Sequence, residues 1–342
     1  MNFRRAFTLI ELLVVVSVIA VLIAILLPSL GKARATARAV KCAVSMRSIA
    51  QGVAGYLTEN NGIYPPSYVY SDGQGGWTVQ GQSQYPPANG YLHWSSFLFG
   101  FTKDLKAFTC PEFQYGGVPR TNPGPNGSYW IDGQVDQNGA TGPNGVQDWQ
   151  APFIAFCANE AIMPRNKITP DAVGADPSTS SGSGSGRVAG FVRQSSISNQ
   201  SSVILATEFN SNWKTIAVDQ GGGAGFKAVG HRSIMPFGLL GSANEFEVSK
   251  SAFYTNLDPA SLMDKNTLIS QTNANYSLIS DNVQLNAVGR NHPGNGSAGG
   301  KAMGGASNFL YVDGHVEKKS IVDTLNNREW GASFYSMGGA VR

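Results

Sequence analysis

Charged residues are scarce in this chain of 342 residues. Asp, Glu, Lys and Arg make up 14% of the sequence, against roughly 25% in an ordinary soluble domain. The net charge of +3 is small and its sources are scattered, which argues against a nucleic-acid partner. Glycine is abundant, with 41 residues, and 42% of the chain is hydrophobic. This composition favours a loop-rich extracellular or periplasmic domain with enough apolar residues for a core.

Residues that bind metals or act as nucleophiles are also few. The three cysteines, Cys42, Cys110 and Cys157, form no C-x-x-C pair, which excludes a zinc site of the usual spacing. Four histidines are few for a metalloenzyme, and no Ser-His-Asp or Cys-His arrangement has a recognisable local context. We therefore predict no catalytic residues, no metal site and no enzymatic activity. An odd number of cysteines allows one disulfide and one free thiol.

A long apolar run lies near the N-terminus. It extends from Phe7 to Leu30, about 24 residues, and roughly 20 are needed to cross a bilayer as a helix. A secretory signal peptide has a shorter apolar core followed by a small-residue cleavage site, and neither feature is present. Arg4 and Arg5 favour a cytoplasmic N-terminus, although basic residues beyond the far end weaken this rule. We predict a single span that stays in the mature protein.

Glu11 lies within this apolar run. A carboxylate inside hydrocarbon costs on the order of 3 kcal/mol unless it finds a partner. One interpretation places Glu11 near the membrane surface, in contact with water. The other gives it a cation from a neighbouring subunit. Charge placement alone leaves both open.

The segment from Arg5 to Glu11, which reads RAFTLIE, resembles the prepilin cleavage motif of type IV pilins and type II secretion pseudopilins. The resemblance implies that a prepilin peptidase cuts between Ala6 and Phe7 on the cytoplasmic side and then N-methylates Phe7. It also implies that Glu11 accepts the positively charged amine of Phe7 from an adjacent subunit. The family usually has Gly before the cut, and this chain has Ala6.

Pro28 matches the same family. Proline inside a helix removes a backbone hydrogen bond, and pilin helices carry a proline here, where the helix can unwind on packing into a filament. Alternatively, Pro28 marks the membrane exit. The resemblance further implies a bacterial inner-membrane location, with the bulk of the chain periplasmic or extracellular, and other pilin-like subunits as partners. It implies an α+β fold, in which a long N-terminal helix packs on an antiparallel sheet with long loops.

An amphipathic pattern follows the apolar run. Cys42, Met46, Ile49, Val53 and Tyr56 recur at spacings of three and four, which predicts one apolar stripe on a helix. We expect one helix from about Phe7 to Thr58, ended by the Asn-Asn-Gly sequence at 60–62. The predicted organisation is a leader at 1–6, a membrane and assembly helix at 7–30, its amphipathic continuation at 31–60 and a globular domain at 61–342.

A narrower resemblance covers residues 42–66. Their pattern, which ends in NNGIYPP, is similar to that of large pseudopilin-like proteins frequent in planctomycetes. The Cys110-Pro111 pair resembles a Cys-Pro segment of the same group. From this resemblance we expect a disulfide between Cys42 and Cys110. The alternative is two buried thiols, which are common.

The C-terminal part carries a hairpin pattern. Residues 307–312 alternate as a strand, Asp313-Gly314 is a turn signal, and His315 begins the return strand. This resembles the His-spacer-Asp-Gly-His motif of the same group, with His292 as the first His and a spacer lengthened by Gly and Ser. A site formed by His292, Asp313, His315 and Glu208, the end of a predicted strand at 202–208, is conceivable. We favour a turn role, because Gly314 supplies a positive φ and Asp313 caps the turn.

Three other segments have the composition of loops or turns. Asp132, Asp136 and Asn138 loosely resemble a calcium loop but lack its Gly and terminal Glu, so calcium is possible and a plain loop is favoured. The tract Ser178–Gly186 is predicted to be flexible, either as a long surface loop or as a linker. The glycines at 221–225 lack the Lys-Ser/Thr of a phosphate loop and are predicted to form a mobile turn.

The functional prediction is a structural pseudopilin of a type II secretion-like or type IV pilus-like assembly. The alternative is a surface adhesin or glycan-binding module displayed on a pilin stalk. The Trp, Tyr and Gly in the middle of the chain would suit that alternative.

Overall fold

The structure is a computed structural model of the chain. It describes residues 8–70, 90–164, 191–219, 225–234, 236, 262–263, 284–294, 304–331 and 335. The expected cleavage site at Ala6 and Phe7 and the Ser178–Gly186 tract lie outside the described residues.

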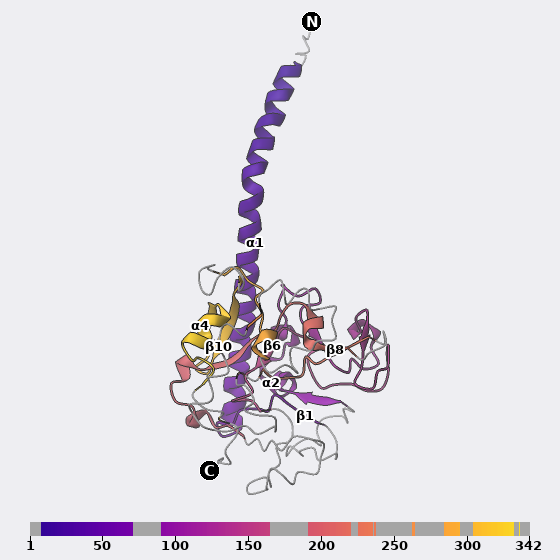
Figure 1. Cartoon of the computed structure of the whole chain (residues 1–342), viewed down its shortest axis with the longest axis vertical. Helices are drawn as coiled ribbons and strands as arrows, with labels where there is room; N and C mark the ends of the chain where they lie inside the picture. Colours follow the sequence, from indigo (N-terminus) through magenta and orange to yellow (C-terminus); the bar gives the residue numbers. More distant parts are fainter. Residues whose placement is uncertain are drawn as a thin grey trace.

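A single long helix, α1, runs from Leu9 to Glu59, 51 residues, close to the predicted span. Its N-cap is Thr8, whose side chain accepts a hydrogen bond from the backbone N–H of Glu11. Pro28 lies inside α1 without ending it. After the C-cap, Asn61 and Gly62 have φ of 53° and 75°, which reverses the chain. The first half of α1 projects from the folded part, and the second half runs through it (Figure 1).

The two halves of α1 differ in burial. Large apolar side chains between Leu9 and Leu30 are exposed, Leu9 by 79% and Leu27 by 63%. In the second half one stripe is buried, as the sequence predicted: Ala39, Cys42, Met46, Ile49, Gly52, Val53 and Leu57.

Tyr56 departs from the predicted stripe, since it is only half-buried and Leu57 takes the interior position. It makes edge-to-face ring contacts with Phe97 and Phe101 of α2 (Trp94–Thr102). The Tyr56 ring therefore packs between α1 and α2 and does not face the main sheet.

The main sheet has four antiparallel strands in the order β11-β10-β7-β6. They are β6 (Phe156–Ala158), β7 (Ile204–Glu208), β10 (Ser307–Tyr311) and β11 (Val316–Lys319). The predicted strands around 202–208 and 307–312 pair with each other, with Phe309 opposite Thr207 and Leu310 opposite Ala206. β10 and β11 form the predicted C-terminal hairpin.

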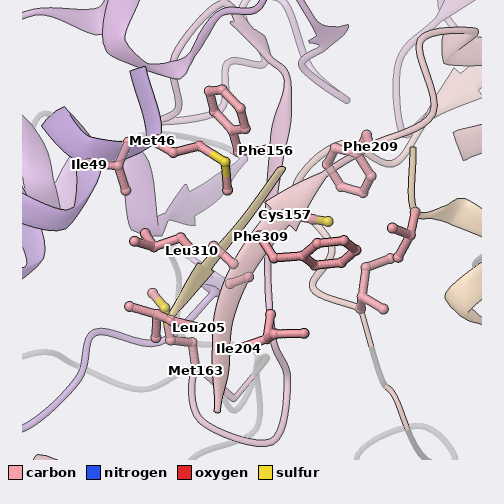
Figure 2. Packing of buried hydrophobic residues seen from close by; sticks show 14 of the residues in the cluster. Met46, Ile49, Phe156, Cys157, Met163, Ile204, Leu205, Phe209, Phe309 and Leu310 are labelled. Carbon is pink, nitrogen blue, oxygen red and sulfur yellow. The ribbon is translucent and has the colours of Figure 1, made fainter. Parts of the chain in front are cut away.

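Successive side chains of β10 point to opposite faces of the main sheet, and both faces carry buried apolar residues. Leu310 lies on the side of Met46 and Ile49 from α1, and Phe309 points to the other side together with Phe209 (Figure 2). All five are buried, so the sheet is covered on both faces and the helix packs on one of them.

Smaller sheets surround this core. β1 (Tyr68–Tyr70) pairs with β2 (Tyr91–His93), and β3 (Val118–Pro119) pairs with β5 (Phe153–Ile154). β4 (Gln134–Val135), β9 (Phe226–Ala228) and β8 (Ala217–Asp219) form a third, mixed sheet in which β4 and β9 are parallel.

The expected α+β class is confirmed, since the long helix packs on an antiparallel sheet, and the smaller sheets lie beside this core. Strands of two or three residues form small ladders of their own beside the main sheet. Within the part of the chain that the structure describes, the other helices are α4 (Ile321–Asn326) and the 3-10 helices Leu105–Phe108, Gly127–Tyr129, Gln194–Ser196, Gln200–Ser202, Trp213–Ile216 and Gln284–Ala287.

Candidate functional sites

The first candidate site is the projecting half of α1. Among the described residues, α1 is the one helix long and apolar enough to cross a membrane by length and composition. None of its most apolar stretch is buried within the protein. An apolar surface of this length is stable only against lipid or against other apolar surfaces.

Glu11 is satisfied within the first turn of this helix. Its Oε2 accepts hydrogen bonds from the backbone N of Thr8 at 2.9 Å and from Thr8 Oγ1 at 2.8 Å. In return, the N–H of Glu11 donates to Thr8 Oγ1 at 3.2 Å, which completes a capping box. A carboxylate in the first turn also interacts favourably with the helix dipole. The amine expected as its intermolecular partner belongs to Phe7, outside the described residues.

A family model described as the prokaryotic N-terminal methylation motif matches residues 1–27. The chain carries the N-terminal signature of type IV pilins and pseudopilins. This pilin-type motif and the apolar α1 together indicate anchoring in a membrane by the N-terminal helix. The motif belongs to structural, non-enzymatic proteins. No curated protein and no solved structure matches the chain.

The second candidate site lies where this pilin-type helix enters the globular part. Cys42 of α1 and Cys110 form a disulfide, with their Cα atoms 5.0 Å apart. This is the pair that the narrower resemblance implies. The third cysteine, Cys157, is a free and buried thiol, and burial raises its pKa well above the usual range.

A buried histidine and a buried glutamate lie beside the disulfide. His292 Nε2 is 2.9 Å from Glu208 Oε1, and both side chains are fully buried. Glu208 also accepts hydrogen bonds from Asn308 Nδ2 at 2.7 Å and from Ser307 Oγ at 3.3 Å. One sulfur from each cysteine, one oxygen of Glu208 and one ring nitrogen of His292 all lie within 4.8 Å of one another.

A second carboxylate faces the other side of the imidazole. Glu112 Oε1 lies 3.7 Å from His292 Nδ1, a nitrogen that makes no hydrogen bond among the described residues. Arg38 Nε of α1 donates to the same Glu112 oxygen at 2.8 Å. Asn308 Nδ2 also reaches the carbonyl of Ala39 at 3.2 Å. The polar cluster therefore joins α1, the segment after Cys110, the end of β7 and the start of β10.

Asp313 and His315 belong to a different place. They lie in the turn after β10, whereas His292 contacts Glu208 beside Ser307 at its start. Gly314 has φ of 93°, and Asp313 Oδ1 accepts from the backbone N of His315 at 3.1 Å. The His315 ring stacks on Tyr311 at 4.2 Å. The four residues considered from the sequence thus divide into a buried pair and an exposed turn.

The loop considered for calcium satisfies its own carboxylate. Asp136 Oδ1 accepts from the backbone N of Asn138 at 2.8 Å and of Ala140 at 2.9 Å. Its Oδ2 accepts from Asn144 Nδ2 at 2.8 Å. Each oxygen therefore has a donor from the loop itself, which is the geometry of a plain turn.

Sequence reasoning missed the buried carboxylate Asp148. Its Oδ1 accepts from Tyr91 N at 2.8 Å and Asn122 Nδ2 at 2.7 Å, and its Oδ2 accepts from Asn122 N at 2.9 Å. Burial raises the pKa of Asp148 to about 6, against the opposing effect of these hydrogen bonds and of Arg120. No local pattern marks Asp148, because its partners are remote in the sequence.

Proposed function

We propose that the chain is a structural, pilin-like subunit of a type II secretion-like or type IV pilus-like assembly. The observation that carries this proposal is the methylation motif over residues 1–27, whose part from Leu9 on forms the exposed apolar start of α1. Half of α1 packs on its own domain, and the other half has apolar surface available for lipid before assembly and for neighbouring helices after it.

Processing would remove the first six residues. In this proposal a prepilin peptidase cuts between Ala6 and Phe7, and Phe7 is N-methylated. The new terminus then lies one residue before the N-cap Thr8. The cut would therefore leave the helix cap intact and place a cation beside the first turn.

Assembly would give Glu11 a second partner. Its carboxylate is held by Thr8 in the single chain. On packing, the terminal amine of Phe7 from a neighbouring copy would bind the same carboxylate. A charge pair of this kind offsets the cost of burying either charge in an apolar helix bundle and sets the stagger between subunits.

Topology in this proposal is a single pass of the bacterial inner membrane. The bulk of the chain lies in the periplasm or beyond it. The Cys42–Cys110 disulfide supports this side of the membrane, because disulfides persist in oxidising compartments.

The test is mass spectrometry of the mature N-terminus in cells with and without the prepilin peptidase. We expect N-methylated Phe7 in the presence of the enzyme and the uncut chain in its absence. Ala6→Gly should be cut as well as the natural chain, and Ala6→Leu should remain uncut. A mature protein that begins at Met1, or that has lost the whole apolar segment, would contradict the proposal.

A further inference from the structure

The Cys42–Cys110 pair lies in a set of four metal-binding side chains. The two cysteines, Glu208 and His292 are all buried and place one ligand atom each within 4.8 Å of the others. They come from four separated positions of the chain and converge only in the tertiary structure. We propose that, when the disulfide is reduced, these four residues form a binding site for a thiophilic divalent cation of the Zn²⁺ class.

The donor set fits this class of ion. Zn²⁺ is bound by thiolate, imidazole and carboxylate, and closed four-ligand sites of this kind are structural. Soft thiolates disfavour Mg²⁺ and Ca²⁺, which prefer oxygen ligands. Two thiolates and the Glu208 carboxylate would carry three negative charges, and a divalent cation offsets two of them.

The surroundings of the cluster hold the ligands in place. Asn308 and Ser307 bind the Glu208 carboxylate. His292 Nε2 faces Glu208, and Nδ1 faces Glu112 at 3.7 Å. Metal-bound histidines usually give their other N–H to a carboxylate, which orients the ring. Glu112, itself bound by Arg38, is placed for this orienting role. This role would also give a hydrogen-bond partner to His292 Nδ1, a buried nitrogen that has none among the described residues.

The disulfide and the metal site exclude each other. A dithiol or phosphine reductant supplies two electrons, the S–S bond breaks, and two protons give two thiols. Zn²⁺ then displaces those two protons and binds both thiolates. Oxidation by a protein disulfide reverses the sequence, since it forms the S–S bond again, releases Zn²⁺ and leaves the oxidant as a dithiol. The disulfide links α1 to the segment that carries Cys110, and the cation would link both to the end of β7 through Glu208.

Cobalt binding to the full chain in detergent tests the site. The protein is reduced with a phosphine, freed of reductant and titrated with Co²⁺. We expect one Co²⁺ per chain, with the visible bands of a tetrahedral ion and a thiolate charge-transfer band, both displaced by Zn²⁺. The oxidised protein should show neither band. His292→Gln and Glu208→Gln should each weaken Co²⁺ binding by at least about tenfold, the lower end of what even orienting residues contribute.

Cys157→Ala is the matched control, since Cys157 is a buried thiol that is not one of the four ligands. It should bind Co²⁺ like the natural chain. Circular dichroism of each oxidised variant checks its fold. The proposal is overturned if reduced natural protein takes up no Co²⁺, whether folded or unfolded. It is equally overturned if both Gln variants keep the full affinity, or if Cys157→Ala alone loses the bands.

Discussion

At the residue scale, the exposed apolar half of α1 contains one carboxylate, Glu11, which accepts two hydrogen bonds from Thr8. We predict that Glu11→Ala inserts into the membrane normally, because loss of a charge from an apolar segment lowers the insertion cost by up to about 3 kcal/mol. Assembly should fail, since the amine of the neighbouring Phe7 would be buried without a partner. Membrane fractionation and a filament or secretion assay measure the two steps.

Ser17→Ala is the control for that change. Ser17 is another polar residue of the span, and its hydroxyl donates only to the carbonyl of Val14 in its own helix. This variant should insert and assemble. Normal assembly by Glu11→Ala would refute the proposed charge pair.

The buried carboxylate Asp148 makes stability depend on pH. Its pKa of about 6 in the folded chain lies above the value of about 3.9 for an unfolded Asp. The Asp148 carboxyl therefore stays protonated up to a higher pH in the folded chain than in the unfolded chain. The contribution of Asp148 to the unfolding free energy falls as pH rises from about 4 to about 6, by on the order of 3 kcal/mol.

Asp148→Asn should remove this slope. The amide cannot ionise, and at pH 4 the natural Asp148 is itself protonated and neutral in the folded chain, so the variant and the natural chain should be close in stability there. Toward pH 7 the natural side chain ionises and the natural chain loses stability, so the variant should become more stable relative to it. Urea unfolding of the detergent-solubilised chain between pH 4 and 7 measures this stability difference. The control is Asp132→Asn, a substitution in an exposed turn. A pH-independent difference would contradict the prediction.

The disulfide closes a loop between residues 68 positions apart in the sequence. Cys42→Ser should lower the unfolding free energy of the globular part by about 2–5 kcal/mol, because the unfolded chain gains freedom. Cys157→Ala should lower the unfolding free energy by less, because it removes a buried sulfur but no cross-link. Thermal unfolding under non-reducing conditions compares them. Equal losses for the two variants would argue against a stabilising cross-link.

At the element scale, close approach of α2 explains two glycines in α1. Glycine has a low helix propensity, so Gly52 and Gly55 by themselves would weaken the end of α1. In the structure a Cβ at Gly52 would lie 2.6 Å from Thr102 Cγ2, and a Cβ at Gly55 would lie 2.6 Å from Phe101 Cδ1. The glycines therefore permit the helix contact, which outweighs their lower helix propensity.

We predict that Gly52→Val destabilises the globular part by about 1–3 kcal/mol through overpacking. Gly31→Ala is the matched change, since no atom lies within 4 Å of a Cβ there. It should be neutral or stabilise the helix by up to about 1 kcal/mol. Thermal unfolding of both variants measures the contrast. A Gly52→Val chain as stable as the natural one would show that α2 shifts freely.

At the scale of the whole molecule, α1 has two separate roles. The half from Cys42 to Leu57 contributes one buried stripe to the core, whereas apolar side chains from Leu9 to Leu30 are exposed. We predict that a variant beginning at Gly31 leaves the membrane fraction. Its globular part should unfold within about 0.5 kcal/mol of the full chain, the usual range for changes at exposed sites. A large loss of stability would show that the projecting half supports the domain.

The sequence by itself determined the features that depend on local periodicity. The apolar run, the methylation motif and the spacing from Cys42 to Val53 predicted one long helix with an exposed half and a buried stripe. Alternation at 307–312 and the Asp313-Gly314 turn predicted the C-terminal hairpin. In each case the residues that decide the structure are close along the chain, so a window of a few residues contains the physical cause.

Only the tertiary structure decided which distant residues meet. It divided the small strands among several sheets, and it placed Tyr56 in the seam with α2. It also separated His292 from Asp313 and joined it to Glu208, beside a disulfide that reaches from α1 to Cys110. These pairings depend on strand register and on how a helix lies on a sheet, because side chains far apart in sequence come within bonding distance only when the whole core has packed.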